Sequence, residues 1–146
     1  MKYIIPLLAL IFLSACATPA QHNTPSKKVE VTIHGVQKTA VKDRLTSDMV
    51  NRGYLMTKSD DSLIAFDRAV DNFMVNALLS SRYDSTTNAR VTYNLIQLDK
   101  DVRVIADCAV ITNPGSAFEK RTDMNGNPDT YKIQAMLDSL KNMIEK

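Results

Sequence analysis

Tryptophan is missing from this chain of 146 residues, and it has only two histidines, two cysteines and four glycines. Aromatic residues make up 6%, so the chain lacks the stacking platforms typical of proteins that bind single-stranded nucleic acid. The formal net charge of +2 gives no strongly basic surface either. The few glycines form no glycine-rich phosphate loop. These shortages argue against nucleic-acid partners and against phosphate-loop chemistry.

The scarcity of histidine and cysteine also leaves little material for catalysis. A hydrolase needs a nucleophile with a base, paired carboxylates or a metal. His22 lies in a polar segment that we expect to be flexible, and His34 ends a predicted strand, where a partly exposed structural role is expected. With one ordered His and one ordered Cys, a zinc site of the usual kind is not expected. We therefore predict no enzyme activity, no metal and no cofactor.

The stretch that begins at Asp123 partly matches the sequence pattern of a calcium-binding loop. Asp123, Asn125 and Asn127 alternate as the first ligands of such a loop do. The pattern then fails, because Pro128 stands where the loop needs glycine and Gln134 where it needs a bidentate glutamate. We interpret the stretch as a turn that leads into a helix cap.

Residues 1–15 have the features of an export signal. Lys2 is followed by the uncharged run from Ile4 to Leu13, and small residues follow it. As a helix this run would reach roughly 15 Å, about half of a bilayer core. It is therefore too short to span a membrane.

The next residues, Leu13-Ser14-Ala15-Cys16, resemble the lipobox of bacterial lipoprotein precursors. The resemblance implies a diacylglycerol thioether on Cys16, cleavage between Ala15 and Cys16, and acylation of the new amino group. The residue after the cysteine is Ala17, not the Asp that often retains such proteins in the inner membrane. This implies an outer-membrane protein that faces the periplasm. The alternative is an ordinary signal peptide, cut near Ala17 or Ala20.

Anchoring at Cys16 has consequences for the rest of the chain. Residues 16–28 contain two prolines and no hydrophobic period, which predicts a flexible tether with roughly 20 Å of reach. Cys108 has no partner for a disulfide, and the alternation around it predicts a small buried residue. Residues 29–146 are left as a single domain.

The hydrophobic pattern of this domain alternates between the periods of strands and helices. Gly53 is placed to close the first helix, and Asn127 and Pro128 to begin the last one. Tight hairpins imply antiparallel pairing, and amphipathic helices need a sheet face to pack on. We predict an α+β two-layer sandwich with a mainly antiparallel sheet of about five strands and helices on one face. We expect strands at 29–33, 54–58, 63–70, 90–98 and 102–112, helices at 39–52, 71–80 and 128–145, and loops at 82–88 and 113–127.

This order of elements resembles that of the helix-grip domains in the lipoprotein subunits of the β-barrel assembly machinery. The stretch Asn113-Pro114-Gly115-Ser116-Ala117-Phe118-Glu119-Lys120 is also similar to segments of uncharacterised proteobacterial lipoproteins. Neither resemblance supplies a functional residue.

Two classes of function remain. The first is a non-enzymatic envelope lipoprotein that binds another envelope protein as an interaction or accessory assembly module. Tyr83 and Phe118 lie in predicted loops and are candidates for its contact surface. The alternative is a module that binds a small molecule, a lipid or a glycan in a groove between sheet and helices.

Overall fold

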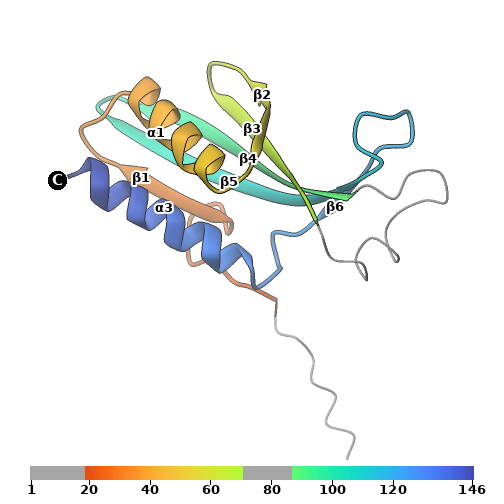
Figure 1. Ribbon diagram of the computed structural model, residues 1–146. Coiled ribbons are helices and arrows are strands. Elements are labelled where there is room, and N and C mark those ends of the chain that lie inside the picture. Colours follow the sequence, from red (N-terminus) through yellow and green to blue (C-terminus); the bar gives the residue numbers. More distant parts are fainter. Residues whose placement is uncertain (1–18, 71–86) are drawn as a thin grey trace, which may run out of the picture.

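A computed structural model describes residues 19–70 and 87–146 of the chain, and Figure 1 shows its arrangement. Strands and helices follow one another in a mixed order. In chain order they are β1 (Val29–Ile33), α1 (Lys38–Asn51), β2 (Leu55–Ser59), β3 (Leu63–Ala69), β4 (Thr87–Leu98), β5 (Asp101–Thr112), β6 (Lys120–Asp123) and α3 (Thr130–Ile144).

The sheet is organised around the long β4–β5 hairpin, which pairs in register from Thr87 opposite Thr112 to Leu98 opposite Asp101. Within the described residues the sheet has six strands, with the order β1-β5-β4-β3-β2. Every pair is antiparallel. The outer edge of β5 is shared, because β1 pairs with residues 102–106 and β6 with residues 109–112.

The core lies between one face of this sheet and the two helices, which Figure 1 shows on the same side. Alternation along the strands directs Val91, Tyr93 and Leu95 of β4 to this face, and all three are buried. In α1 and in α3, apolar residues recur every three or four positions, so each helix has one apolar stripe. The buried apolar helix residues are Val41, Leu45 and Met49 of α1, and Met136, Leu137 and Leu140 of α3. The predicted α+β two-layer fold is confirmed.

Helix α1 ends where the sequence predicts. Gly53 has a φ of +80°, a conformation that suits glycine and that other residues adopt at a cost. The Gly53 amide donates to the carbonyl of Val50 at 2.9 Å, and the Tyr54 amide to that of Met49 at 3.1 Å. These bonds cap the last turn and direct the chain into β2.

The stretch 113–127, predicted as one loop, contains β6. Residues Lys120–Asp123 are almost all exposed and carry no apolar alternation, so their pattern does not indicate a strand. They form one because β1 leaves the second half of the β5 edge unpaired. The last helix begins at Thr130, two residues after Pro128, and Asn127 Oδ1 accepts the amide of Asp129 at 2.8 Å in the turn before it.

Residues 20–28 are packed on the domain, which corrects the prediction of a flexible tether for this part of the chain. The Ala20 amide donates to the carbonyl of Gly126 at 2.8 Å. His22, expected to be mobile, is 9% exposed, and its Nε2 lies 2.9 Å from Thr130 Oγ1. The Lys28 ammonium pairs with Asp107 at 2.6 Å. The folded unit therefore begins near Ala20, not at Val29.

Several predictions lie outside the described residues. They are the export signal, the cleavage position after Ala15, the lipid on Cys16, the helix at 71–80 and the side chain of Tyr83.

Candidate functional site

The sheet face opposite the helices carries charged side chains, and its buried or half-buried carboxylates are paired. Asp67 on β3 is 5% exposed and receives both Nε and Nη2 of Arg90 on β4, at 2.7 and 2.8 Å. The second terminal nitrogen of Arg90 lies 3.2 Å from Glu119 Oε1. This bidentate geometry is the strongest form of an ion pair between side chains.

A second pair links the edge strand to the centre of the sheet. Glu30 on β1 receives Nε and Nη2 of Arg103 on β5, at 2.6 and 3.0 Å, and also the Ser26 amide at 3.1 Å. The Arg103 guanidinium holds the pKa of Glu30 below its ordinary value, although burial acts in the opposite direction. Glu30 therefore stays ionised and fully engaged, and it is not a free acid or base.

Asp107 joins the segments that meet at the junction of β1 and β6. It pairs with Lys28 and Arg121, and its Oδ1 accepts Asn125 Nδ2 at 2.8 Å. Burial raises the pKa of Asp107, but the hydrogen bonds from Lys28 and Asn125 outweigh this and leave it below its ordinary value. The same amide of Asn125 accepts the Cys108 N–H through Oδ1 at 2.9 Å. Asp107 thus has a structural role at this junction.

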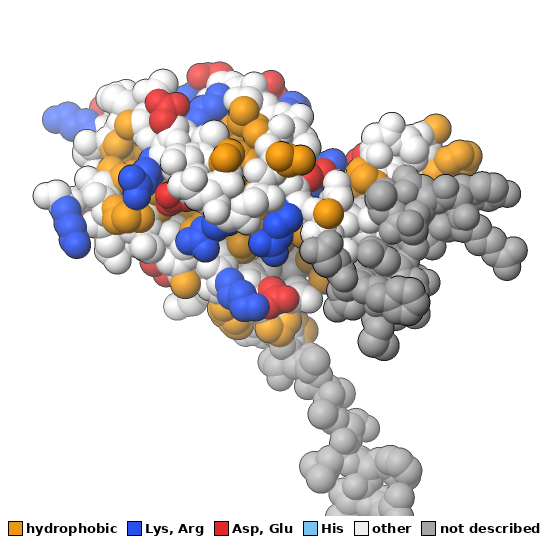
Figure 2. All heavy atoms as spheres, in the orientation of Figure 1, with side chains coloured by type: hydrophobic (Ala, Val, Ile, Leu, Met, Phe, Trp, Pro, Cys, Tyr) orange, Lys and Arg blue, Asp and Glu red, His pale blue; other side chains and the backbone are white. Residues whose placement is uncertain are grey.

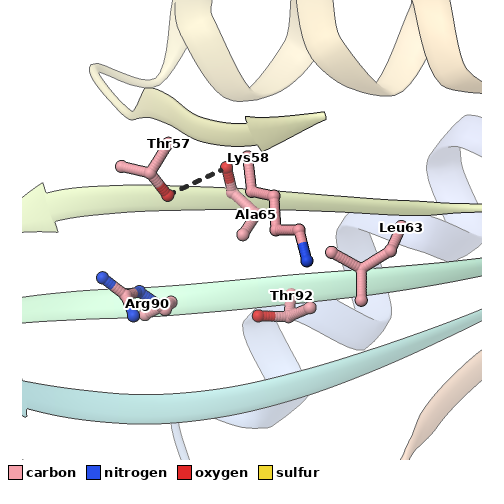
Figure 3. A pocket seen from close by; sticks show the side chains of 6 residues that line it. All are labelled: Thr57, Lys58, Leu63, Ala65, Arg90 and Thr92. Carbon is pink, nitrogen blue, oxygen red and sulfur yellow. Dashed lines mark hydrogen bonds between the residues drawn. The ribbon is translucent and has the colours of Figure 1, made fainter. Parts of the chain in front are cut away.

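Between these pairs the helix-free face has a shallow hollow of about 370 Å³ near β2. Figure 3 shows its lining side chains, which come from three neighbouring strands. Thr57 donates a hydrogen bond to the carbonyl of Ala65 at 3.3 Å, and Arg90 is already engaged by Asp67. Lys58 is the cation of this hollow that remains accessible, and it pairs with Asp60 at 3.1 Å.

The larger cavity is a groove of about 740 Å³ on the helix face. It opens between the C-terminal end of α1 and the N-terminal end of α3, over β3, β4 and β5. Its volume falls within the range typical of ligand sites. Apolar side chains form its floor and walls, among them Val91, Cys108, Val110, Ile133 and Met136.

The rim of this groove is basic. Arg52, Arg68 and Lys132 line it, and Figure 2 shows basic side chains gathered between the two helices. Lys132 pairs with Asp129 at 2.7 Å, and both side chains are mostly exposed. The charges of Lys132 and Asp129 cancel each other, so Arg52 and Arg68 give the rim its net positive charge.

Arg68 is positioned by stacking. Its guanidinium carbon lies 4.7 Å from the centre of the Tyr54 ring, and Nη1 lies 3.5 Å from the Arg52 carbonyl. Sequence reasoning missed both arginines, because each stands singly at the end of an element and a groove rim has no local pattern. The sequence predicted only that a groove could lie between the sheet and the helices, and it did not indicate which residues would line that groove.

Two titratable groups lie deep beside the groove. Burial raises the pKa of the Cys108 thiol to about 11, with Asp107 acting in the same direction. Burial also raises the pKa of Tyr93 well above its ordinary value, and its hydroxyl donates to Met49 Sδ at 3.3 Å. Both groups stay neutral at physiological pH. Cys108 is 7% exposed, as strand alternation predicts, and it is not poised as a nucleophile.

Each of the two histidines has a hydrogen-bond partner. His34 Nδ1 lies 2.8 Å from Asp101 Oδ2, but its side chain is 60% exposed and no hydroxyl accompanies it among the described residues. The Thr130 hydroxyl donates its one proton to the carbonyl of Asn127 at 2.6 Å, so it accepts from His22 Nε2. His22 is thereby held against the start of α3.

The stretch tested as a calcium loop uses its oxygen atoms for hydrogen bonds within the protein. Asp123 Oδ1 accepts the Asn125 amide at 2.8 Å, and Asn127 Oδ1 accepts that of Asp129 at 2.8 Å. Within residues 19–70 and 87–146, no three His, Cys, Asp or Glu side chains gather as a metal-binding set.

Phe118, the described member of the predicted contact surface, is 81% exposed. It lies in the loop between β5 and β6, which projects from the end of the sheet in Figure 1. Hydrogen bonds order this loop. The Ser116 hydroxyl donates to the carbonyl of Asn113 at 2.8 Å and accepts the Phe118 amide at 3.1 Å, and Glu119 Oε2 accepts the Gly115 amide at 2.8 Å.

In the described part of the chain, no helix has the length and apolar character needed to cross a membrane. No protein-family model matches the sequence, and no curated protein matches it significantly.

Proposed function

We propose that the chain is a non-enzymatic lipoprotein of the bacterial envelope that binds another envelope protein. In this proposal Cys16 carries the lipid anchor, and the domain faces the periplasm from the outer membrane. The contact surface is the β5–β6 loop, Asn113–Glu119, centred on Phe118.

The observation that carries this proposal is an exposed aromatic ring on an ordered loop. Phe118 is the most exposed of the large hydrophobic residues in the described chain, at 81%. Aromatic side chains are enriched among the residues that contribute most to binding between proteins. A loop that is already ordered loses less conformational entropy when a partner binds.

The anchoring of the loop to the sheet supports the same proposal. Glu119 accepts the Gly115 amide within the loop and contacts Arg90, which in turn holds the buried carboxylate of Asp67. The position of Phe118 is therefore coupled to the rigid centre of the sheet. This is the arrangement expected of a site that must present one side chain reproducibly.

Photo-crosslinking in intact cells tests this proposal. A photoreactive phenylalanine analogue replaces Phe118 in one variant and Leu55, which is 75% exposed at the β2 edge, in a matched control. We expect one specific protein adduct from position 118 and none of comparable yield from position 55. Phe118→Ala should weaken binding of the purified partner at least about tenfold, and Leu55→Ala should not. Equal adduct patterns from both positions would contradict the proposal.

A second function is favoured by the groove between the helices. Its volume of about 740 Å³, apolar floor and basic rim suit a small molecule, a lipid or a glycan with anionic character. This function is compatible with a protein partner on the β5–β6 loop, because the loop residues do not line the groove.

A further inference from the structure

The groove lies at the end of the domain where the described chain begins. Pro19 packs against Gly126, where an added Cβ would lie 3.7 Å from the Cβ of Pro19. Figure 1 shows the start of the described chain beside the N-terminal end of α3. Asn127, Asp129 and Thr130 follow Gly126 directly and line the groove.

The chain between this point and the proposed lipid is very short. Three peptide units separate Cys16 from Pro19, so the two Cα atoms lie within about 11 Å of each other. Residues 20–28 do not lengthen this reach, because their contacts hold them on the domain. A lipid on Cys16 therefore brings the N-terminal end of α3, and the groove beside it, to the level of the lipid headgroups.

Side chains at this end suit a membrane surface. Tyr131 is half exposed, and its hydroxyl accepts the Gln21 amide at 3.1 Å, which holds the ring at the same end. Tyrosine commonly lies at the level of the headgroups, because its ring is apolar and its hydroxyl polar. Lys132 is also mostly exposed here.

The charge of the groove rim selects the kind of lipid. The Arg68 guanidinium lies over the Tyr54 ring, and its Nη1 lies 3.5 Å from the Arg52 carbonyl. Within the described residues, neither Arg52 nor Arg68 forms an ion pair with a carboxylate. Arginine favours phosphate because its planar donors match two oxygen atoms at once. The apolar floor beneath the rim suits the adjoining part of an acyl chain.

From these observations we infer that the groove binds an anionic phospholipid of the membrane in which the protein is anchored. Arg52 and Arg68 hold its phosphate, and the wall that includes Ile133 contacts its acyl chain. The inference rests on the proposed lipidation of Cys16 for access to the bilayer. It deepens the second function by naming the ligand class.

Photoreactive lipids test this inference. The full protein, purified from the membranes of the cells that produce it, is reconstituted into vesicles of phosphatidylcholine, alone or with a minority of phosphatidylglycerol. In each case a trace of the same headgroup class carries a diazirine in its acyl chain. After illumination, mass spectrometry maps the adducts. We expect adducts in peptides around Met49–Tyr54 and Ile133–Met136, and a yield about tenfold higher with the phosphatidylglycerol probe.

Paired variants supply the control. Arg52→Gln with Arg68→Gln should lower the phosphatidylglycerol adducts about tenfold, whereas Lys58→Gln with Lys100→Gln, which removes the same charge elsewhere, should leave them unchanged. Circular dichroism and thermal unfolding verify that both variants fold. Equal yields from the two probes, or adducts confined to residues 16–28, would overturn the inference.

Flotation of the vesicles separates this inference from the anchor. If the parent protein does not float, lipidation of Cys16 is wrong, and the same probes are then applied in detergent micelles. Groove adducts that depend on Arg52 and Arg68 in micelles still support the lipid site. Micelles that give no groove adduct count against the site independently of the anchor.

Discussion

The ion pair between Asp67 and Arg90 gives the sharpest stability prediction. Asp67→Asn keeps the shape of the side chain and removes its charge. Breaking a buried ion pair from one side costs about 3–5 kcal/mol, because the remaining charge is left without its partner. The Asp67 side chain is 6% exposed, but that of Arg90 keeps 24% exposure and a contact with Glu119. Solvent and Glu119 offset part of the cost, so we expect a loss of about 2–4 kcal/mol.

The assay is urea unfolding followed by circular dichroism, with thermal unfolding as a second measurement. A loss of 1 kcal/mol lowers the thermal unfolding midpoint by roughly 4 °C, so the midpoint of Asp67→Asn should fall by about 8–16 °C. The matched control is Asp60→Asn, which removes a carboxylate from the Lys58–Asp60 pair, where both side chains are 58% exposed. Exposed pairs contribute at most about 1 kcal/mol. If the two variants lose the same stability, burial of Asp67 does not have the energetic role assigned to it.

Three further predictions concern single groups. Because the pKa of Glu30 is lowered in the folded state, chiefly by Arg103, its stabilising effect is present above the unfolded pKa near 4.5 and is lost as pH falls through the lower folded value. Acid unfolding curves should therefore be shallower in this range for Glu30→Gln, and identical slopes would refute the linkage. The Cys108 thiol, with a pKa of about 11, should react slowly with an aromatic disulfide reagent at pH 8 in the folded protein and rapidly in urea. Fast reaction without urea would contradict its burial. Gly53→Ala should cost about 1 kcal/mol, since φ is +80° and no atom lies within 4 Å of the added Cβ, so that the loss measured in urea unfolding comes from the backbone alone. An unchanged unfolding midpoint would contradict this reason.

Much of the fold was predictable because burial leaves a period in the sequence. The alternation around Val91, Tyr93 and Leu95 indicates a strand with one face in the core, and all three residues are buried. The alternation in Val29–Ile33 likewise places its three apolar residues in the core. The positive φ of Gly53 likewise follows from a glycine at the end of an apolar helical stripe.

Features that depend on contacts between distant segments were not predictable. β6 has mostly exposed side chains, so only the unpaired edge of β5 explains it. Residues 20–28 contain no apolar period, and they are held by backbone hydrogen bonds, His22 and Lys28, none of which leaves a local pattern.

Of the two candidate sites, one could be predicted from local sequence and the other could not. Phe118 could be named from the sequence, because an aromatic residue three positions after Gly115, in a predicted loop, suggests exposure. The groove was anticipated only as a class of site. Arg52 and Arg68 come together through the packing of the α1 end beside β3, which their separation in the sequence does not reveal.

Anchoring through Cys16 is common to both proposals, and one measurement tests it most directly. Cells that produce the parent, Cys16→Ala or Cys108→Ala are labelled with a palmitate analogue and then fractionated into membrane and soluble parts. The account predicts label and outer-membrane location for the parent and for Cys108→Ala, and no label for Cys16→Ala. A parent that takes up no label, together with a Cys16→Ala variant that stays equally membrane-bound, would contradict it.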